Sequence, residues 1–249
     1  MDCKKALVEM NGNLDLSVEY LRTKGIAKAE SRAGRTTSEG MIGSALSSDC
    51  TVGVIAEINC ETDFVARTDD FKALVNVVLA HAMITDAADT EALLATPVVR
   101  RVTRFAVAQG GVGSYTHHNA KVGVLVEASL GNPAVAPTEP VQAMLKAVAE
   151  HAAAMNPLAL DRSGISAELV EKERRIAEDQ ARQSGKPEAM IEKIATGKLE
   201  AFFKDMSLVS QPWVRDPKKT ITDLVHETGK AAGTDIAVTR FVRFALGDA

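Results

Sequence analysis

A stretch of this sequence recurs at a constant spacing, and the repeat constrains the fold more than any other feature. Residues 39–44 match residues 109–114, and residues 52–57 match residues 122–127, at an offset of 70. Apolar positions at helical spacing recur at the same offset: Phe71, Leu74, Val75, Val78, His81 and Ala82 correspond to Val141, Met144, Leu145, Val148, His151 and Ala152. Each copy predicts a strand, a turn, a strand, a loop and a helix. We therefore expect an α+β fold with a core of two duplicated subdomains and antiparallel sheets.

A third strand is expected to complete each copy. Residues 102–105 have the sequence Val-Thr-Arg-Phe, and the same four residues recur at 238–241. This offset is 136 residues, so the second copy would carry an insertion of about 66 residues ahead of its last strand.

The insertion is predicted to contain an antiparallel coiled-coil hairpin over residues 166–206. Ser166 suits a helix start, Gly185 a helix end, and Pro187 the start of a second helix. Eight apolar side chains are expected to face inward: Leu169, Val170, Ile176, Ala177, Ile191, Ile194, Leu199 and Phe202. Three pairs of residues, each four apart, would form ion pairs on the solvated face: Glu168–Lys172, Glu171–Arg175 and Glu178–Arg182.

These elements divide the chain into three parts. Residues 1–35 are predicted to form two short helices and a basic linker, and helices this short need a packing partner. Residues 36–108 form the first core subdomain, and residues 109–249 form the second, with its hairpin.

Composition narrows the class of protein. Lys and Arg number 29 and Asp and Glu 33, which gives a net charge of −4 and argues against nucleic acid as the main partner. The three cysteines are odd in number and lack C-x-x-C spacing, which indicates free thiols in a reducing compartment. No apolar run of about 18 residues and no secretory signal occur. We expect a cytoplasmic protein, or one in the matrix of an organelle of bacterial origin, without membrane contact.

The loop over residues 59–67 is the first candidate site. Thr62 can cap a helix that presents Asp63 and Phe64 together. Because Phe64 lies seven residues before Phe71, a buried ring is the ordinary interpretation. The repeat argues against burial, since residues 61–65 correspond to Gly-Asn-Pro-Ala-Val at 131–135, and the second copy folds without the Asp and Phe. We therefore favour an exposed recognition role for Phe64.

Other candidate sites are weaker. His117 and His118 fall in a predicted surface loop, and no third donor at suitable spacing predicts a metal site. The recurrent glycines Gly40, Gly43 and Gly53 suit turns or close backbone approach, not a phosphate loop. Two alternative functions stay open on the residues alone. One is a small-molecule hydrolase or transferase that uses Cys60 and Asp63, and the other is an RNA-binding module that uses the basic run from Lys24 to Arg35.

Several motifs together resemble one family, the translation elongation factors Ts, which are guanine-nucleotide exchange factors for elongation factor Tu. Residues 57–65 resemble the central signature of that family, and residues 1–7 resemble part of its N-terminal ubiquitin-associated-like module. The resemblance extends over essentially the whole chain through four further segments: 113–117, 184–187, 211–212 and 240–244.

The resemblance implies an exchange factor, with no catalytic residues for covalent chemistry, no metal and no cofactor. Thr62, Asp63, Phe64 and Val65 would form a wedge that enters the G domain of elongation factor Tu near its Mg²⁺ site. Further contacts with this partner would come from Met1, Asp2, Lys4 and His117. The resemblance implies no direct contact with nucleic acid and leaves a homodimer open.

Overall fold

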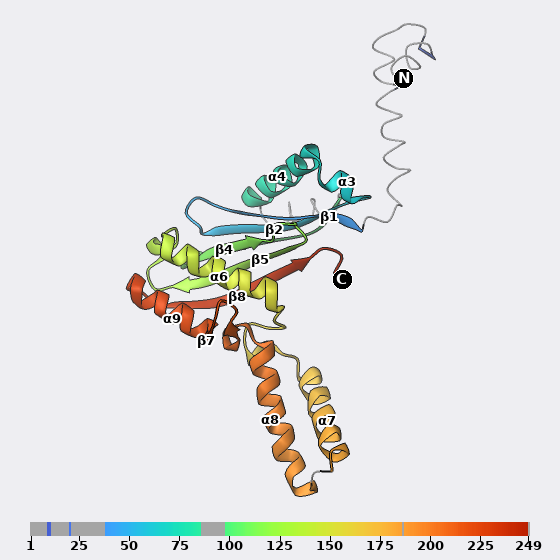
Figure 1. The fold of residues 1–249 in the computed structure, drawn as a ribbon. Helices are drawn as coiled ribbons and strands as arrows, with labels where there is room; N and C mark the ends of the chain where they lie inside the picture. The colour runs from blue at the N-terminus through green and yellow to red at the C-terminus, as the bar shows by residue number, and fades with distance from the viewer. Residues whose placement is uncertain (1–8, 11–19, 21–37, 86–97, 186, 249) are drawn as a thin grey trace.

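The computed structural model describes residues 9–10, 20, 38–85, 98–185 and 187–248. This part of the chain is α+β with antiparallel sheets, as predicted. It holds two three-stranded sheets, each with its second strand along the chain at the centre, and two long helices that project from one end (Figure 1). No described helix is long and apolar enough to cross a membrane. Most of the predicted module over residues 1–35, including Met1, Asp2 and Lys4, lies outside the described residues.

The sequence repeat is visible in the two sheets. The first unit consists of β1 (Glu39–Leu46), β2 (Val52–Cys60), the single-turn helix α3 (Asp63–Ala66), α4 (Asp69–Ile84) and β3 (Val99–Ala106). The second consists of β4 (Gly110–Thr116), β5 (Val122–Leu130), the 3₁₀ turn η1 (Pro133–Val135), α6 (Glu139–Met155) and β8 (Ile236–Ala245). The register of each central strand shifts immediately after an equivalent glutamate, Glu57 or Glu127. The duplication therefore extends to the details of strand pairing.

The two sheets pack face to face, with α4 on the outer side of one sheet and α6 on the outer side of the other. The core between them takes equivalent side chains from both: Ile42, Ile55 and Phe105 with Val112, Leu125 and Phe244. A Cβ on Gly53 would lie 2.5 Å from Val112 Cγ1, and one on Gly123 would lie 2.6 Å from Ile42 Cγ2. These recurrent glycines therefore allow the close approach of the opposite sheet.

The pairing of the third strands shows that the predicted offset of 136 was wrong. Phe105 of β3 and Phe244 of β8 pair with the equivalent glycines of β2 and β5. The structural offset runs from Phe105 to Phe244, three residues more than the match of residues 102–105 with 238–241 implied. The four-residue motif misled because pairing follows the phenylalanine that enters the core between the sheets, and the motif recurs out of phase with it.

The two hairpin turns are held by reciprocal contacts between the sheets. Cys50 and Ala120, at equivalent positions, have φ angles of 57° and 55°, in the left-handed region. The Cys50 carbonyl accepts a hydrogen bond from the Val112 N–H at 2.7 Å, and the Ala120 carbonyl accepts one from the Ile42 N–H at 2.7 Å. Each turn is thereby fixed to the neighbouring subdomain.

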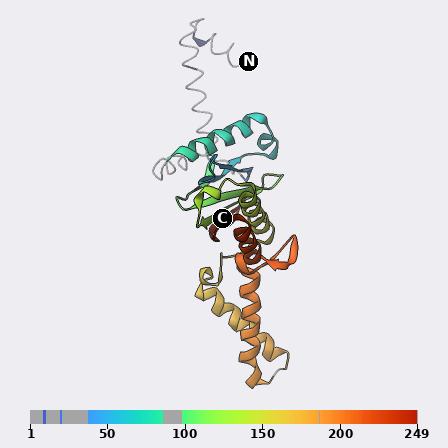
Figure 2. The same ribbon diagram turned by 90° about the vertical axis from the view of Figure 1, so that its left-hand side faces the viewer.

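The insertion holds two long helices, α7 (Ala167–Gln183) and α8 (Glu188–Met206), which lie side by side in both views (Figures 1 and 2). Six side chains are buried on them: Ala177, Ala181, Ile191, Ala195, Leu199 and Phe203. The predicted inward position of Ile176 was wrong, because its side chain is 39% exposed. Phe203 is buried where Phe202 was expected, and Phe202 is half-buried. The buried row of α7 therefore consists of the small residues Ala177 and Ala181, and not of the larger apolar side chain of Ile176.

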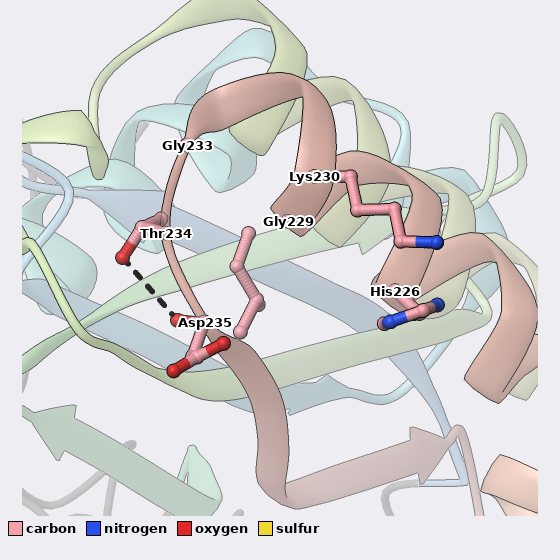
Figure 3. Close-up of a pocket in the computed structure, with 7 residues that line it drawn as sticks. His226, Gly229, Lys230, Gly233, Thr234 and Asp235 are labelled. Carbon is pink, nitrogen blue, oxygen red and sulfur yellow. Dashed lines mark hydrogen bonds between the residues drawn. The ribbon is translucent and has the colours of Figure 1, made fainter.

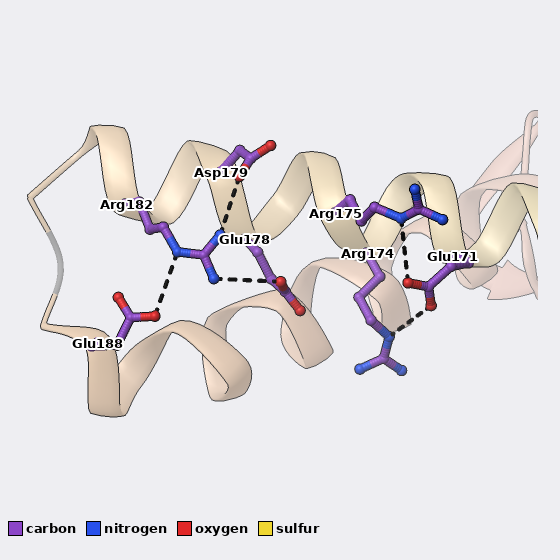
Figure 4. A network of polar contacts seen from close by, with 7 residues as sticks. All are labelled: Glu171, Arg174, Arg175, Glu178, Asp179, Arg182 and Glu188. Atoms are coloured by element: carbon purple, nitrogen blue, oxygen red, sulfur yellow. Dashed lines mark hydrogen bonds and ion pairs between the residues drawn. The ribbon is translucent and has the colours of Figure 1, made fainter.

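Ion pairs cover the solvated face of this helix pair (Figure 4). Two of the three predicted pairs form, Glu171–Arg175 at 3.4 Å and Glu178–Arg182 at 3.6 Å. The third prediction was wrong, since Glu168 and Lys172, both described, form no ion pair. Arg182 also reaches Asp179 and, across the turn, Glu188 on α8. Exposed pairs contribute little individually, about 0–1 kcal/mol each, so this network is one of mutually supporting weak contacts.

The base of the insertion rests on α6. Its short elements are η2 (Arg162–Gly164), η3 (Leu208–Ser210), β6 (Pro212–Trp213), β7 (Asp216–Thr220) and α9 (Ile221–Ala232). His151 of α6 is fully buried there, and its Nδ1 accepts a hydrogen bond from the Val214 N–H at 3.2 Å. Nε2 therefore carries the ring proton and donates to Gln211 Oε1 at 2.9 Å. Both ring nitrogens of this buried histidine are therefore hydrogen-bonded.

Candidate functional site

The helix α3 is built by local hydrogen bonds directly after β2. The Thr62 hydroxyl accepts a hydrogen bond from the Val65 N–H at 3.3 Å and caps the helix, as predicted. The Cys60 thiol donates to the Thr62 carbonyl at 3.1 Å. At the other end, the Thr68 hydroxyl donates to the Val65 carbonyl at 2.8 Å and accepts from the Phe71 N–H, which starts α4. The single turn is thus tied to both neighbouring elements.

The outward face of α3 is apolar. Ala66 is the buried residue of this helix, and it packs in the core beneath α4. Phe64 is 77% exposed and Val65 is 44% exposed. A Phe side chain gains about 1.5–3 kcal/mol when it is buried, so this ring lies in the less favourable environment in the free protein. An exposed aromatic ring on a rigid turn is typical of an interaction site.

Asp63 lies beside the ring and carries the negative charge of the site. Its carboxylate pairs with Arg67 Nη2 at 2.9 Å, one helical turn further on. The Asp63 side chain is 42% exposed and the Arg67 side chain 77% exposed, so the pair is open to solvent. Such a pair is easily exchanged for another partner because its net contribution is about 0–1 kcal/mol.

The equivalent segment of the second subdomain is built differently. There Asn132 caps η1, and Pro133 and Ala134 replace the Asp and Phe. This loop is fastened to the start of β8: the Gly131 N–H donates to the Asp235 carbonyl at 2.9 Å, and the Asn132 N–H donates to Thr234 Oγ1 at 2.8 Å. The same architecture therefore folds without an exposed ring, and Phe64 is not required by the fold.

The corner at Thr234 and Asp235 borders a shallow pocket of about 320 Å³ (Figure 3). His226 and Lys230 line it from α9, and both are exposed. Among the described residues that line this pocket, none is a buried charged side chain, so we assign no ligand to it.

The turn between β4 and β5 lies next to α3. A cleft of about 460 Å³ is lined by Asp63 of α3, by Arg67 directly after α3, and by His118 and Lys121 of the turn. His117, the predicted contact residue, is half-buried beside it, with its Nδ1 2.9 Å from the Tyr115 hydroxyl and its ring stacked obliquely on His118 at 4.2 Å. The structure therefore brings the two predicted contact regions together on one side of the molecule.

Sequence reasoning missed His118, Arg67 and Lys121 as parts of this cleft. Which of two adjacent histidines faces α3 depends on the conformation of the turn, and the left-handed Ala120 that shapes it has no signature in the sequence. The charged residues Arg67 and Lys121 have no distinctive spacing. Their shared position became visible only from the packing of one subdomain against the other.

The alternative based on Cys60 finds no support in the geometry. Its side chain is buried, and burial raises the pKa of the thiol above its ordinary value. The thiolate, which is the nucleophile, is therefore disfavoured. Within the described ranges, no group of three or more His, Cys, Asp or Glu side chains could hold a metal ion. The basic run of the RNA-binding alternative, from Lys24 to Arg35, falls outside the described residues.

Comparison with known proteins agrees with the resemblance in the motifs. The sequence model of the family described as "Elongation factor TS" matches residues 97–248. A protein named "Elongation factor Ts" from Desulfovibrio desulfuricans is 42% identical over 263 residues, covering 99% of this chain and 92% of its own. The chain belongs to the elongation factor Ts family.

Other relatives agree along the whole length. Proteins of the same name from Trichlorobacter lovleyi and Prosthecochloris aestuarii are 38% and 36% identical, and cover 100% and 99% of this chain. The matched regions are 88% and 93% of the relatives' own lengths. Membership in the elongation factor Ts family makes the chain a translation elongation factor that acts by nucleotide exchange on elongation factor Tu. It is not an enzyme that makes or breaks covalent bonds, and the hydrolase and transferase alternative is set aside.

Proposed function

We propose that this chain releases GDP from elongation factor Tu by inserting α3 into the G domain near the Mg²⁺ site. Phe64 and Val65 would enter an apolar gap, and Asp63 would compete for cationic or N–H groups that hold the metal and the phosphates. Thr62 would keep the turn rigid. The observation that carries the proposal is the exposed Phe64 ring, 77% accessible on a capped turn that the sister subdomain builds without it.

The physical basis is competition for the surroundings of the nucleotide. GDP in a G domain is held by Mg²⁺ and by backbone N–H groups around its phosphates. A wedge that displaces those groups weakens GDP binding without attacking the nucleotide. The coupling is reciprocal, so GDP weakens binding of the factor by the same multiple. A turn ordered before binding loses little conformational entropy when it inserts.

Further contacts with the same G domain would extend this interface. His118 lines the cleft beside α3 and the ring of His117 stacks on it, which supports one continuous surface for both contact regions. Met1, Asp2 and Lys4 would add N-terminal contacts. The second subdomain and the helix pair α7–α8, proposed as a coiled-coil hairpin, would touch other parts of elongation factor Tu. The chain would act in the cytoplasm, or in the matrix of an organelle of bacterial origin.

The test is release of a fluorescent GDP analogue from elongation factor Tu, followed by stopped flow at saturating factor. We expect Phe64→Ala to lower the maximal release rate by about tenfold to a hundredfold, the equivalent of a buried Phe side chain. Val214→Ala removes another exposed apolar side chain, 48% accessible and far along the chain, and should leave the rate unchanged. A maximal rate for Phe64→Ala equal to that of the parent would rule out the wedge.

A further inference from the structure

The outer face of α4 is apolar along almost its whole length. Leu74, Val77 and Ile84 are 37%, 65% and 82% exposed. Together with the exposed Ala73, Ala80 and His81 they form a row at helical spacing, which we call the outer stripe. No Asp, Glu, Lys or Arg occurs from Ala73 to Ile84. A helix face in water usually carries charged residues, so this composition indicates a surface that becomes covered.

The second subdomain provides an internal comparison. Where α4 has Asn76 and Ala80, the equivalent positions of α6 have the charged residues Lys146 and Glu150. Where α4 exposes Leu74 and His81, the equivalent Met144 and His151 are buried, in the core shared with α9 and against Gln211. The face on α6 is thus covered or charged at these positions, and where it stays open, at Ala143 and Ala154, it exposes only single methyl groups. The face on α4 is neither, and Val77 stays open to solvent among the described residues.

We propose that the outer stripe is a second docking surface for elongation factor Tu, continuous with the wedge. This inference rests on the proposed function, from which it takes the partner. Two residues, Arg67 and Thr68, separate α3 from α4. Val77 lies about 13 Å along the helix from Thr68, at about 1.5 Å per residue. A standard interface covers about 800 Å² on each partner, a patch roughly 30 Å across, so a G domain in contact with Phe64 reaches this part of α4.

The chemistry of the stripe defines what it would bind. The complementary surface is an apolar helix face or groove, because the stripe offers methyl groups and one imidazole. Asp69 and Asp70 are exposed at the end of α4 next to the wedge, and they favour basic residues at that edge of the partner. The two surfaces would have different roles: the stripe would contribute affinity for the partner, and the wedge would change the nucleotide site.

The test separates affinity from exchange. Val77→Lys and Ile84→Lys place a charge in the stripe, and Ala154→Lys places one at the exposed position of α6 that is equivalent to Ile84. We expect the two stripe variants to raise the Kd for elongation factor Tu·GDP about tenfold or more in calorimetric titrations. At saturating factor their maximal GDP release rate should equal that of the parent. Ala154→Lys, which adds the same charge to the outer face of α6, should raise the Kd much less than either stripe variant.

Each result decides between occupants of the stripe. An unchanged Kd for Val77→Lys, in a variant with parental circular dichroism, overturns the proposal. A dimer that Val77→Lys separates in sedimentation equilibrium, without a change in Kd, assigns the stripe to a second copy of this chain and also overturns it. If Lys perturbs the helix, Val77→Ser replaces it, with a several-fold rise in Kd expected. If Val77→Lys raises the Kd while Phe64→Ala releases GDP at the parental rate, the stripe is supported and the wedge is rejected.

Discussion

Phe64 is the residue on which the account depends, because the fold gains nothing from its exposed ring. The free protein keeps this side chain in water, and binding would recover about 1.5–3 kcal/mol on its burial. Asp63 is similar, since its pair with Arg67 is open to solvent and adds little to stability. Residues that the fold does not need, held on a rigid turn, are those expected to serve binding.

Glycines illustrate the opposite case, in which a single residue is required by the packing. A Cβ on Gly123 would lie 2.6 Å from Ile42 Cγ2, in the core between the sheets. We expect Gly123→Ala to lower the free energy of unfolding by about 1–3 kcal/mol through overpacking. Urea unfolding measures this change directly.

Gly197 is the matched control for that substitution. It lies inside α8, and no atom comes within 4 Å of the position that a Cβ would take, so an added methyl group meets open space. Gly197→Ala should raise the free energy of unfolding by about 0.5–1 kcal/mol, because Ala favours a helix interior. Equal effects of the two substitutions would contradict the assignment of Gly123 to close sheet packing.

At the scale of elements, α3 depends on its cap. A helix of four residues has few internal hydrogen bonds, so loss of the Thr62 hydroxyl bond to the Val65 N–H removes much of its order. We expect Thr62→Ala to cost about 1 kcal/mol locally and to reduce the GDP release rate. Hydrogen exchange at Val65 should accelerate in this variant. Thr62→Ser keeps the cap and should behave like the parent, and a parental rate for Thr62→Ala would show that exchange does not need the ordered turn.

The base of the insertion responds to pH through His151. Burial lowers the pKa of His151 below its ordinary value, while the hydrogen bond to Gln211 opposes that shift. The unfolded chain takes up a proton near pH 6.5 and the folded chain resists it. The stability contributed by the neutral ring is therefore complete above about pH 6.5 and is lost as the pH falls below that value.

A substitution isolates this contribution. His151→Gln should be less stable than the parent at pH 8, because it loses buried contacts, and its stability should change less between pH 7 and pH 5. Urea unfolding at a series of pH values measures both effects. Parallel pH profiles for the two proteins would exclude His151 as the titrating group.

The repeat made much of the fold predictable at this scale. Equal spacing made β2 the counterpart of β5 and α4 the counterpart of α6, because one strand–turn–strand–loop–helix unit occurs twice. The predicted alignment of the two third strands was wrong by three residues, because a four-residue motif does not indicate which Phe enters the core between the sheets. On α7, the inward position of Ala177 was predicted correctly, but Ala181 was missed and Ile176 was wrong, because the buried row follows the small alanines.

The whole molecule is a duplicated core in which one copy is specialised. Both copies keep the same turns, glycines and sheet contacts. They differ at two places: the first copy exposes α3 and the outer face of α4, whereas the second copy fastens the η1 loop to the start of β8 and covers part of α6 with α9. The wedge and the outer stripe lie on the first copy, and the insertion lies on the second. The sequence identified the asymmetry at Asp63 and Phe64, but the cleft with His118 and Lys121 depends on how the two copies pack.

The most direct measurement of the wedge is a map of what Phe64 touches. A photoreactive phenylalanine analogue at position 64 would be crosslinked to elongation factor Tu·GDP, and the joined peptides identified by mass spectrometry. The same analogue at Ala134, the equivalent position of the second subdomain, is the control. If Phe64 enters the G domain, crosslinks from position 64 will reach the G-domain segments that surround the Mg²⁺ and the phosphates, and none of these will come from position 134. Crosslinks from position 64 confined to other domains, or the same peptides from both positions, would contradict this insertion.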